Sequence, residues 1–245
     1  MPALDAASGR QADPAPPRAP GELRLTDQQI AFFNTFGYLK IPGLFRDDVD
    51  RMLAGFEEIF ANNATWDTNS ALHFEQKRQI IPGFVDKSEQ LAWMVDDPRT
   101  VGVVRSLIGD EFTYTESDGN LFYCDTSWHP DAYAAPLSIY HVKLSFYLDP
   151  LHGANGAIRV MPGTNDYQSR YANSLRRDLR DPLAIPQIFG VGPDEIPSWT
   201  IPSDPGDLIA WNFRTIHASF NGGERRRLFS LNFREGAPDA AADAG

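Results

Sequence analysis

A histidine and an aspartate stand two residues apart in the segment Trp128-His129-Pro130-Asp131. On an extended backbone, side chains at i and i+2 project to the same face, so both can reach one metal ion from a short piece of chain. Two histidines and one carboxylate on one face of an octahedron, with the other positions open, suit non-haem Fe(II) oxygen chemistry. The third ligand would lie far downstream, and our candidate is His217 in Thr215-Ile216-His217-Ala218-Ser219.

A His-x-Asp pair is a weak signal when it stands alone. Short polar turns produce it by chance, and a solvated loop is then the alternative interpretation. Three other histidines, His73, His141 and His152, compete for the metal role, although isolated histidines are more often structural than metal-binding. His152 lies in a turn and is expected to be exposed, whereas His141 could line a pocket.

Composition narrows the function classes. The 245 residues fit one domain, and a hydrophobic content of 42% is sufficient for a core. The net charge of -11 argues against partners such as nucleic acid or anionic membranes, which require basic surfaces. The single cysteine, Cys124, excludes an intramolecular disulfide, so we expect a reducing, cytoplasmic setting. A small-molecule substrate is compatible with this charge, and we expect a monomer or homodimer.

The two ends of the chain differ in composition from its middle. Residues 1–22 contain five prolines and almost no large apolar side chains, so they cannot bury enough surface to offset the cost of ordering. We expect a disordered arm over residues 1–22, one folded domain over residues 23–236 and a flexible tail over residues 237–245. The arm lacks the apolar stretch of a signal peptide, and deletion of residues 1–20 should leave folding and turnover nearly unchanged.

The order of the elements predicts the fold class. Helical periodicity comes first, at residues 26–36, 47–62, 88–96 and 98–108. Short strands bounded by turn residues follow, near residues 112–116, 120–124, 137–148, 157–161, 208–212, 217–220 and 227–233. This order indicates a mainly β protein with N-terminal helices, built as a jelly-roll, cupin-like double-stranded β-helix. Residues 167–194 interrupt the strand pattern. Their Arg-rich part, residues 176–180, could form a helix or a loop over the barrel mouth, although a charge run of this kind is more often a solvated face.

One strand is predicted to have a polar face. Four apolar residues at 142, 144, 146 and 148 alternate with His141, Lys143, Ser145 and Tyr147. In a closed barrel, the polar face would line a cavity. The candidate pocket residues on this and other strands are Asn120, Tyr123, His141, Lys143 and Trp211.

Four segments, in this order, resemble the phytanoyl-CoA dioxygenase family of Fe(II)- and 2-oxoglutarate-dependent oxygenases. They are the His-x-Asp motif at 128–131, YLDP at 147–150 with GAIRVMPGT at 156–164, GDLIAW at 206–211 with His-Ala-Ser at 217–219, and RRLFSL at 226–231. The resemblance implies Fe(II) held by His129, Asp131 and His217, with 2-oxoglutarate and O2 as cosubstrates. Asn165 stands where the family often has histidine.

The resemblance also implies the reaction, hydroxylation of a C–H bond of a small-molecule metabolite with release of succinate and CO2. Related halogenases replace the metal-binding carboxylate with alanine or glycine, so the presence of Asp131 favours hydroxylation over halogenation. Desaturation, epimerisation or cyclisation by the same oxidant stays open. The alternatives from other classes are a cupin-like, non-redox metal-binding protein and a metal-dependent isomerase or hydrolase. No segment resembles an acyl-CoA-binding signature, which favours a small polar metabolite over a lipid thioester.

In this family an arginine binds the 2-oxoglutarate carboxylate, and Arg225, Arg226 and Arg227 are all candidates because the loop after His217 is shorter than usual. Strand parity favours Arg226, which would share a polar face with Ser230 and Asn232, where its planar fork suits a carboxylate. Arg227 would share the aromatic face. Ser219 would point the same way as His217 and could donate a hydrogen bond to that carboxylate. We therefore expect the cosubstrate to contact Arg226, Ser219, Asn120 and Tyr123, and the substrate to contact Lys143, His141 and Trp211.

Overall fold

The computed structural model describes residues 21–62, 78–122, 124–132, 139–222 and 225–236. His73, Tyr123, the predicted tail and nearly all of the predicted arm lie outside these residues. Glu22, which the sequence assigned to the arm, accepts a hydrogen bond from Arg105 at 2.5 Å and belongs to the packed chain. Among the helices in these ranges, none combines the length and the apolar character that a membrane crossing requires.

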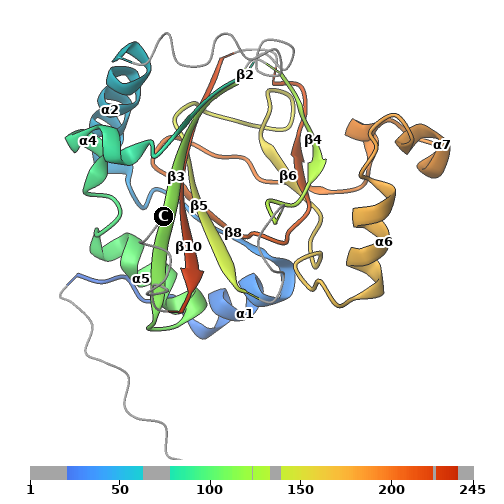
Figure 1. Cartoon of the computed structure of the whole chain (residues 1–245), viewed down its shortest axis with the longest axis horizontal. Helices are drawn as coiled ribbons and strands as arrows, with labels where there is room; N and C mark the ends of the chain where they lie inside the picture. The colour runs from blue at the N-terminus through green and yellow to red at the C-terminus, as the bar shows by residue number, and fades with distance from the viewer. Residues whose placement is uncertain (1–20, 63–77, 123, 133–138, 223–224, 237–245) are drawn as a thin grey trace, which may run out of the picture.

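The strands form two antiparallel sheets (Figure 1). The large sheet has the order β1-β8-β5-β10-β3-β2 and the small sheet has the order β4-β9-β6-β7. From β3 onward the chain passes repeatedly from one sheet to the other, as in a jelly roll, so the predicted fold class is confirmed. The large sheet contains β1 (Tyr38–Ile41), β2 (Arg78–Pro82), β3 (Phe112–Phe122), β5 (His141–Tyr147), β8 (Leu208–Asn212) and β10 (Arg226–Glu235). The small sheet contains β4 (Thr126–His129), β6 (Ile158–Val160), β7 (Trp199–Thr200) and β9 (His217–Ser219).

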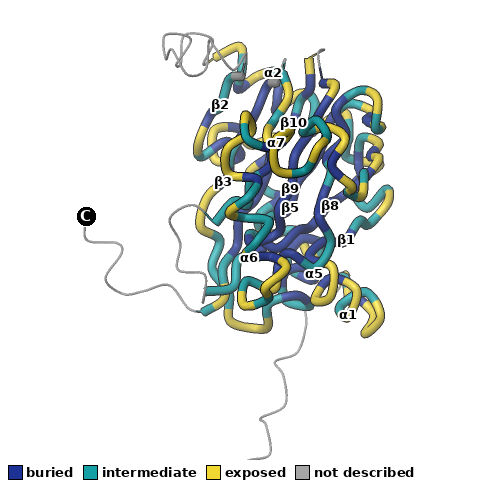
Figure 2. Tube along the Cα trace, turned by 90° about the vertical axis from the view of Figure 1, so that its right-hand side faces the viewer, coloured by how far each residue is buried: buried dark blue, intermediate teal, exposed yellow. Residues whose placement is uncertain are grey.

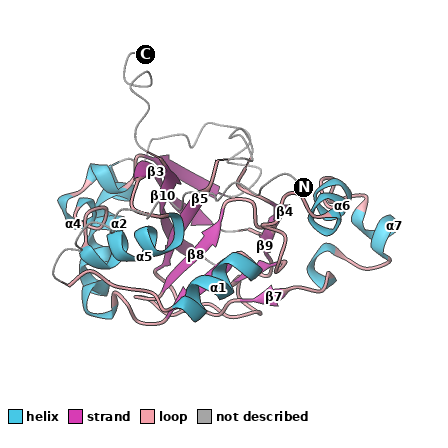
Figure 3. Ribbon diagram, turned by 90° about the horizontal axis from the view of Figure 1, so that it is seen from below, coloured by secondary structure: helices cyan, strands magenta, loops and turns pink. Residues whose placement is uncertain are grey.

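Helices flank this pair of sheets on opposite sides (Figure 3). The N-terminal group packs against the large sheet and includes α1 (Asp27–Phe36), η1 (Arg46–Asp48), α2 (Val49–Asn62), η2 (Val85–Lys87), α4 (Glu89–Ala92) and α5 (Pro98–Ile108). The group on the side of the small sheet is α6 (Arg170–Asp178), α7 (Ile185–Phe189) and η3 (Pro193–Glu195). These three elements occupy the stretch that interrupts the strand pattern of the sequence.

The alternating residues of the large sheet separate an apolar layer from a pocket. Val142, Leu144 and Phe146 of β5 join the core beneath the N-terminal helices, together with the apolar residues of α2 and α5. Lys143 and Tyr147 face the other way, toward the small sheet. The inner strands β5, β8, β9 and β10 are mostly buried, whereas α1 and α7 are mostly exposed and α6 is partly exposed (Figure 2). The predicted polar face of β5 lines the pocket at Lys143 and Tyr147.

The C-terminal end of α1 helps to fix the loop that carries His217. The capping box of Thr26 and Gln29 starts α1, and Gly37 ends it with a φ of 82°. The carbonyl oxygen of Gly37 accepts hydrogen bonds from the backbone of Asn212 and from the hydroxyl of Thr215, both at 2.9 Å. The end of the helix thus holds the turn between β8 and β9 in place.

The prediction was wrong about a break in β3. The sequence predicted two strands separated by a turn at Asp118-Gly119, but β3 is continuous because β10 pairs along its whole length and β2 along its second half. Gly119 has a different role here. Its missing side chain makes room for the Phe84 ring, which would clash with a Cβ atom at that position. The glycine permits a close helix-to-sheet contact, and Asp118 is left on the pocket side of the strand.

Candidate metal centre

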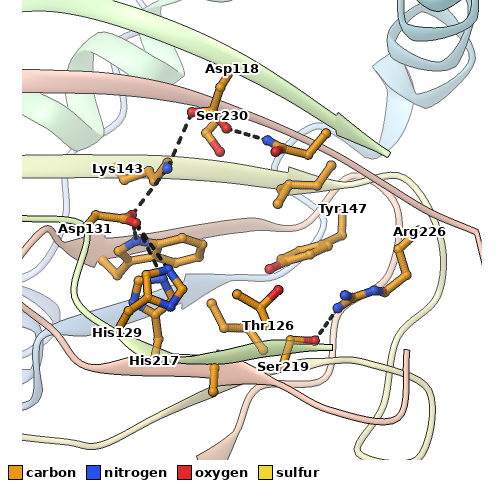
Figure 4. A pocket seen from close by; sticks show the side chains of 15 residues that line it. Asp118, Thr126, His129, Asp131, Lys143, Tyr147, His217, Ser219, Arg226 and Ser230 are labelled. Atoms are coloured by element: carbon orange, nitrogen blue, oxygen red, sulfur yellow. Dashed lines mark hydrogen bonds and ion pairs between the residues drawn. The ribbon is translucent and has the colours of Figure 1, made fainter. Parts of the chain in front are cut away.

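The three predicted metal ligands converge in the structure (Figure 4). His129 ends β4 and His217 begins β9, and the antiparallel pairing of these strands sets the two residues opposite each other. The Asp131 Oδ1 atom lies 3.7 Å from His129 Nε2 and 3.6 Å from His217 Nε2. Ligands at right angles and about 2.1 Å from a metal would stand about 3 Å apart. A contraction of roughly 0.7 Å would bring the atoms to that spacing, so the donor set and its geometry fit Fe(II).

Both histidine rings are oriented by backbone carbonyls close to them in sequence. His129 Nδ1 lies 2.7 Å from the carbonyl oxygen of Ser127, and His217 Nδ1 lies 2.9 Å from that of Thr215. With its proton on Nδ1, each ring donates to its carbonyl and presents the Nε2 lone pair toward Asp131. Burial and, next, the neighbouring His217 lower the pKa of His129 to about 4, so this imidazole is neutral at pH 7, as a metal ligand must be.

The second carboxylate oxygen of Asp131 is engaged by other groups. Asp131 Oδ2 accepts a hydrogen bond from Trp211 Nε1 at 3.3 Å and lies 3.2 Å from Lys143 Nζ. Burial by itself raises the pKa of Asp131, but the nearby charge of Lys143 holds this pKa well below its usual range. The carboxylate is therefore ionised and directs one oxygen, Oδ1, toward the histidines.

The opposite end of the pocket contains Arg226, whose side chain is almost fully buried (Figure 4). Arg226 Nη1 donates to the carbonyl oxygen of Gly156 at 2.6 Å and to Ser219 Oγ, and Nη2 donates to the carbonyl oxygen of Cys124 at 2.8 Å. Glycines surround the guanidinium, since a Cβ atom on Gly222 would stand 2.6 Å from Arg226 Nε and one on Gly156 would stand 2.8 Å from Arg226 Cδ. These contacts fix the guanidinium in the pocket wall.

Tyr147 and Thr126 line the pocket between its two ends (Figure 4). Burial raises the pKa of Tyr147 to about 12 although the nearby Arg226 lowers it, so the phenol keeps its proton and can donate a hydrogen bond. Neither residue was among the predicted cosubstrate or substrate contacts. The alternation of β5 placed Tyr147 on the face of Lys143 and could have identified it, whereas Thr126 carried no signal beyond its closeness to the His-x-Asp motif.

The register predicted for the last strand is confirmed. Arg226 lies on the pocket side of β10 with Ser230, while the aromatic residues of that strand join the core on its other face. Arg227 turns outward and contacts Asp149 Oδ1 at 2.5 Å and Glu57 Oε1 at 2.8 Å. Arg225 also pairs with Glu57, at 2.8 Å. Of the three candidate arginines, Arg226 alone lines the pocket among the described residues.

The other predicted site residues divide into two groups. Ser219, Asn120, Lys143 and Trp211 line the pocket, with the Asn120 amide donating to Asp118. His141 does not line it, and its ring packs edge to face against Phe213 with centroids 5.1 Å apart. The reason is distance along the strand. Residues on one face repeat about every 7 Å, so His141 shares the face of Lys143 but lies beyond the end of the pocket. His152 is exposed, as predicted.

Known proteins resemble this chain in sequence and in fold. The profile of the phytanoyl-CoA dioxygenase (PhyH) family matches residues 33–228. The apoform of EctD from S. alaskensis superposes with a TM-score of 0.66 at 18% identity, covering 90% of this chain and 80% of EctD. HygX from Streptomyces hygroscopicus, with nickel and 2-oxoglutarate bound, gives a TM-score of 0.65 at 18% identity over 88% of each chain. SnoK, a non-haem alpha ketoglutarate-dependent carbocyclase from nogalamycin biosynthesis, gives a TM-score of 0.64 at 18% identity over 90% of this chain and 91% of SnoK.

No curated protein matches the chain. The structural likenesses, at 18% identity, establish a shared fold. The family profile goes further, because residues 33–228 include the His-x-Asp motif, the distal histidine and the buried arginine. The chain therefore belongs to the phytanoyl-CoA dioxygenase family of Fe(II)- and 2-oxoglutarate-dependent oxygenases.

Proposed function

We propose that the protein is an Fe(II)- and 2-oxoglutarate-dependent hydroxylase that acts on a small polar metabolite. The observation that carries the proposal is the presence, in one pocket, of a His-Asp-His triangle and a buried arginine. A metal-binding cupin without a 2-oxo acid cosubstrate does not require a buried arginine, such as Arg226, in the pocket that contains its third metal ligand, His217. HygX, whose structure holds nickel and 2-oxoglutarate together, has the same fold and supports this pairing of roles.

Each pocket residue has a role in this proposal. The Nε2 atoms of His129 and His217 and the Oδ1 atom of Asp131 hold Fe(II). Arg226 pairs with the distal carboxylate of 2-oxoglutarate through a charge-assisted contact, and Ser219 keeps the guanidinium in orientation. The protonated Tyr147 donates a hydrogen bond to the same cosubstrate. When bound, the iron supplies O2 activation and oxidation of the substrate C–H bond, coupled to conversion of 2-oxoglutarate to succinate and CO2.

The polar lining of the pocket supports a polar substrate. Asp118 and Asn120 of β3 and Lys143 of β5, with β10 between the two strands, line the same pocket as Asp131. Groups of this kind are costly to cover with a lipid chain, because a buried polar group that loses its hydrogen bonds to water must find new ones. A metabolite with hydroxyl, amine or carboxylate groups would supply them.

The test is a screen of polar metabolites against the Fe(II)-loaded enzyme with 2-oxoglutarate and O2. We expect succinate to form in equal amount to a product that has gained one oxygen atom. A product that has lost two hydrogens would indicate desaturation or cyclisation instead of hydroxylation. A product of unchanged mass would indicate epimerisation. A protein that binds Fe(II) but not 2-oxoglutarate would support the non-redox cupin instead.

A further inference from the structure

Lys143 of β5 and Asp118 of β3 form a charged pair next to the metal triangle (Figure 4). Lys143 Nζ lies 3.4 Å from Asp118 Oδ1 and 3.2 Å from Asp131 Oδ2. Asp118 in turn accepts hydrogen bonds from the amides of Asn120 and Asn232. Lys143 is thus held between two carboxylates, and one of them is a proposed metal ligand.

This arrangement distinguishes the two oxygens of Asp131. Oδ1 faces the Nε2 atoms of His129 and His217, whereas Oδ2 lies against Lys143 and Trp211. A carboxylate can bind a metal through one oxygen or through both. Binding through both would use a coordination position that a 2-oxo acid or O2 requires, so the contacts to Oδ2 keep that position open.

We propose that Lys143 is a positioning residue that holds Asp131 to metal binding through one oxygen, with Asp118 as its anchor. This inference rests on the metal site proposed above and adds a positioning role to the substrate contact predicted for Lys143. Residues that orient metal ligands change metal affinity about 10- to 100-fold when they are replaced. Trp211 contributes a second, longer contact to the same oxygen, at 3.3 Å.

The charge of Lys143 and its positioning role predict opposite effects of its removal on metal affinity. A cation near the metal repels it, so removal of Lys143 would strengthen binding of a divalent metal if charge alone mattered. Removal weakens binding if Lys143 holds Asp131 in place. Lys143→Met on its own leaves Asp118 as a carboxylate without its cation, which endangers the fold. The double variant Lys143→Met/Asp118→Asn removes one charge of each sign and avoids this problem.

The experiment titrates Co(II) into the wild-type protein and its variants, followed by calorimetry and by the visible absorption of the metal. We expect Lys143→Met and the double variant to bind Co(II) about 10- to 100-fold more weakly than the wild type, with an altered absorption that reports a changed ligand set. Lys143→Arg keeps a cationic donor and should lose less affinity for Co(II) than Lys143→Met. Lys40→Met is the matched control, since Lys40 pairs with Asp207 at 2.7 Å outside the pocket and should keep wild-type affinity.

Equal or tighter Co(II) binding by the double variant, with an unchanged absorption, would overturn the proposal. Thermal melting establishes that each variant is folded. If Lys143→Met is not folded, the Co(II) affinity of the double variant decides the question. A wild-type protein that binds no Co(II) would contradict the proposed metal site itself, so the two failures are distinguishable.

Discussion

The two ends of the pocket are held in different ways. At the metal end, each histidine ring is oriented by the carbonyl two residues before it, on Ser127 or Thr215. At the other end, Arg226 is held by the carbonyls of Gly156 and Cys124, which lie 70 and 102 residues away in sequence. The histidines therefore depend on the geometry of two short paired strands, whereas the arginine site forms only when distant parts of the barrel meet.

This difference implies that the two ends can be disabled separately. The metal ligands contact one another and the surrounding polar network, and Arg226 contacts backbone carbonyls and Ser219. Variants at one end should change the affinity for metal, and variants at the other should change the affinity for 2-oxoglutarate. Substitutions at each end of the pocket test this separation.

Asp131→Ala should have the largest effect. It removes the one carboxylate of the triangle, and loss of a ligand should exceed the 10- to 100-fold changes typical of groups that only orient ligands. We expect Fe(II) affinity to fall more than about 100-fold, with complete loss of succinate formation. Asp178→Ala, on α6, is the control and should behave as the wild type. An Asp131→Ala protein with full activity would remove Asp131 from the metal site.

Arg226→Ala should weaken 2-oxoglutarate binding and leave metal binding nearly unchanged. A charge-assisted hydrogen bond contributes about 1.5–3 kcal/mol, which corresponds to roughly a tenfold to hundredfold loss of affinity. Calorimetric titration of 2-oxoglutarate into the anaerobic Fe(II) protein measures this loss.

Arg225→Ala and Arg227→Ala are the matched controls for that experiment. Both side chains pair with Glu57 outside the pocket, so their removal should change 2-oxoglutarate affinity much less. Arg227→Ala should lower the melting temperature more than Arg225→Ala, since Arg227 also contacts Asp149. If Arg227→Ala gave the large loss of affinity and Arg226→Ala did not, the assignment of Arg226 as the residue that binds the 2-oxoglutarate carboxylate would be wrong.

Gly222→Ala tests the packing around the Arg226 guanidinium without replacing the arginine itself. The new methyl group would stand 2.6 Å from Arg226 Nε, so the guanidinium must move. Overpacking of this kind costs about 1–3 kcal/mol, and we expect the KM for 2-oxoglutarate to rise about tenfold with Fe(II) affinity retained. Gly153→Ala is the control, because its methyl group would meet its nearest neighbour at 3.7 Å. Equal kinetics for the two variants would show that Arg226 tolerates displacement.

Ser219→Ala should have the smallest effect of the series. Ser219 Oγ donates to the carbonyl oxygen of Gly156 at 2.7 Å and accepts from Arg226, so its loss removes one support of the guanidinium. A single hydrogen bond contributes about 0.5–1.5 kcal/mol, which predicts a rise in the KM for 2-oxoglutarate of roughly two- to tenfold. Steady-state kinetics at saturating Fe(II) measures it. A loss as large as that of Arg226→Ala would mean that Ser219 contacts the cosubstrate directly.

The sequence predicted those features that depend on short-range periodicity. The closeness of His129 to Asp131 and the parity of β10 both involve residues a few positions apart. The structure brings His129 and Asp131 together, although Asp131 lies in a bend beyond the end of β4, and it has the predicted parity of β10. His217 was the candidate third ligand from the start, but no local pattern links it to His129, and the family segments supported the choice. The capping box of α1 was predictable for the same reason, since Thr26 and Gln29 are neighbours on one helical turn.

The features that the sequence did not predict depend on contacts between distant elements. Asp118-Gly119 looked like a turn, and only the packing of Phe84 shows why a glycine stands in a continuous strand. The Lys143–Asp118 pair crosses from β5 to β3 over the intervening β10, so it requires the strand order of the large sheet. His141 was assigned to the pocket from its face alone, because alternation gives the face of a residue but not how far the pocket extends.

The central claim is that one pocket binds a metal and 2-oxoglutarate together, and a single titration tests it most directly. 2-Oxoglutarate is titrated into the anaerobic wild-type protein loaded with Fe(II), and again after the metal is removed with a chelator. We predict one binding site per chain, with an affinity at least about tenfold higher when Fe(II) is present, since the metal and Arg226 hold opposite ends of one ligand. Equal affinity with and without Fe(II), or no binding in either case, would contradict the account.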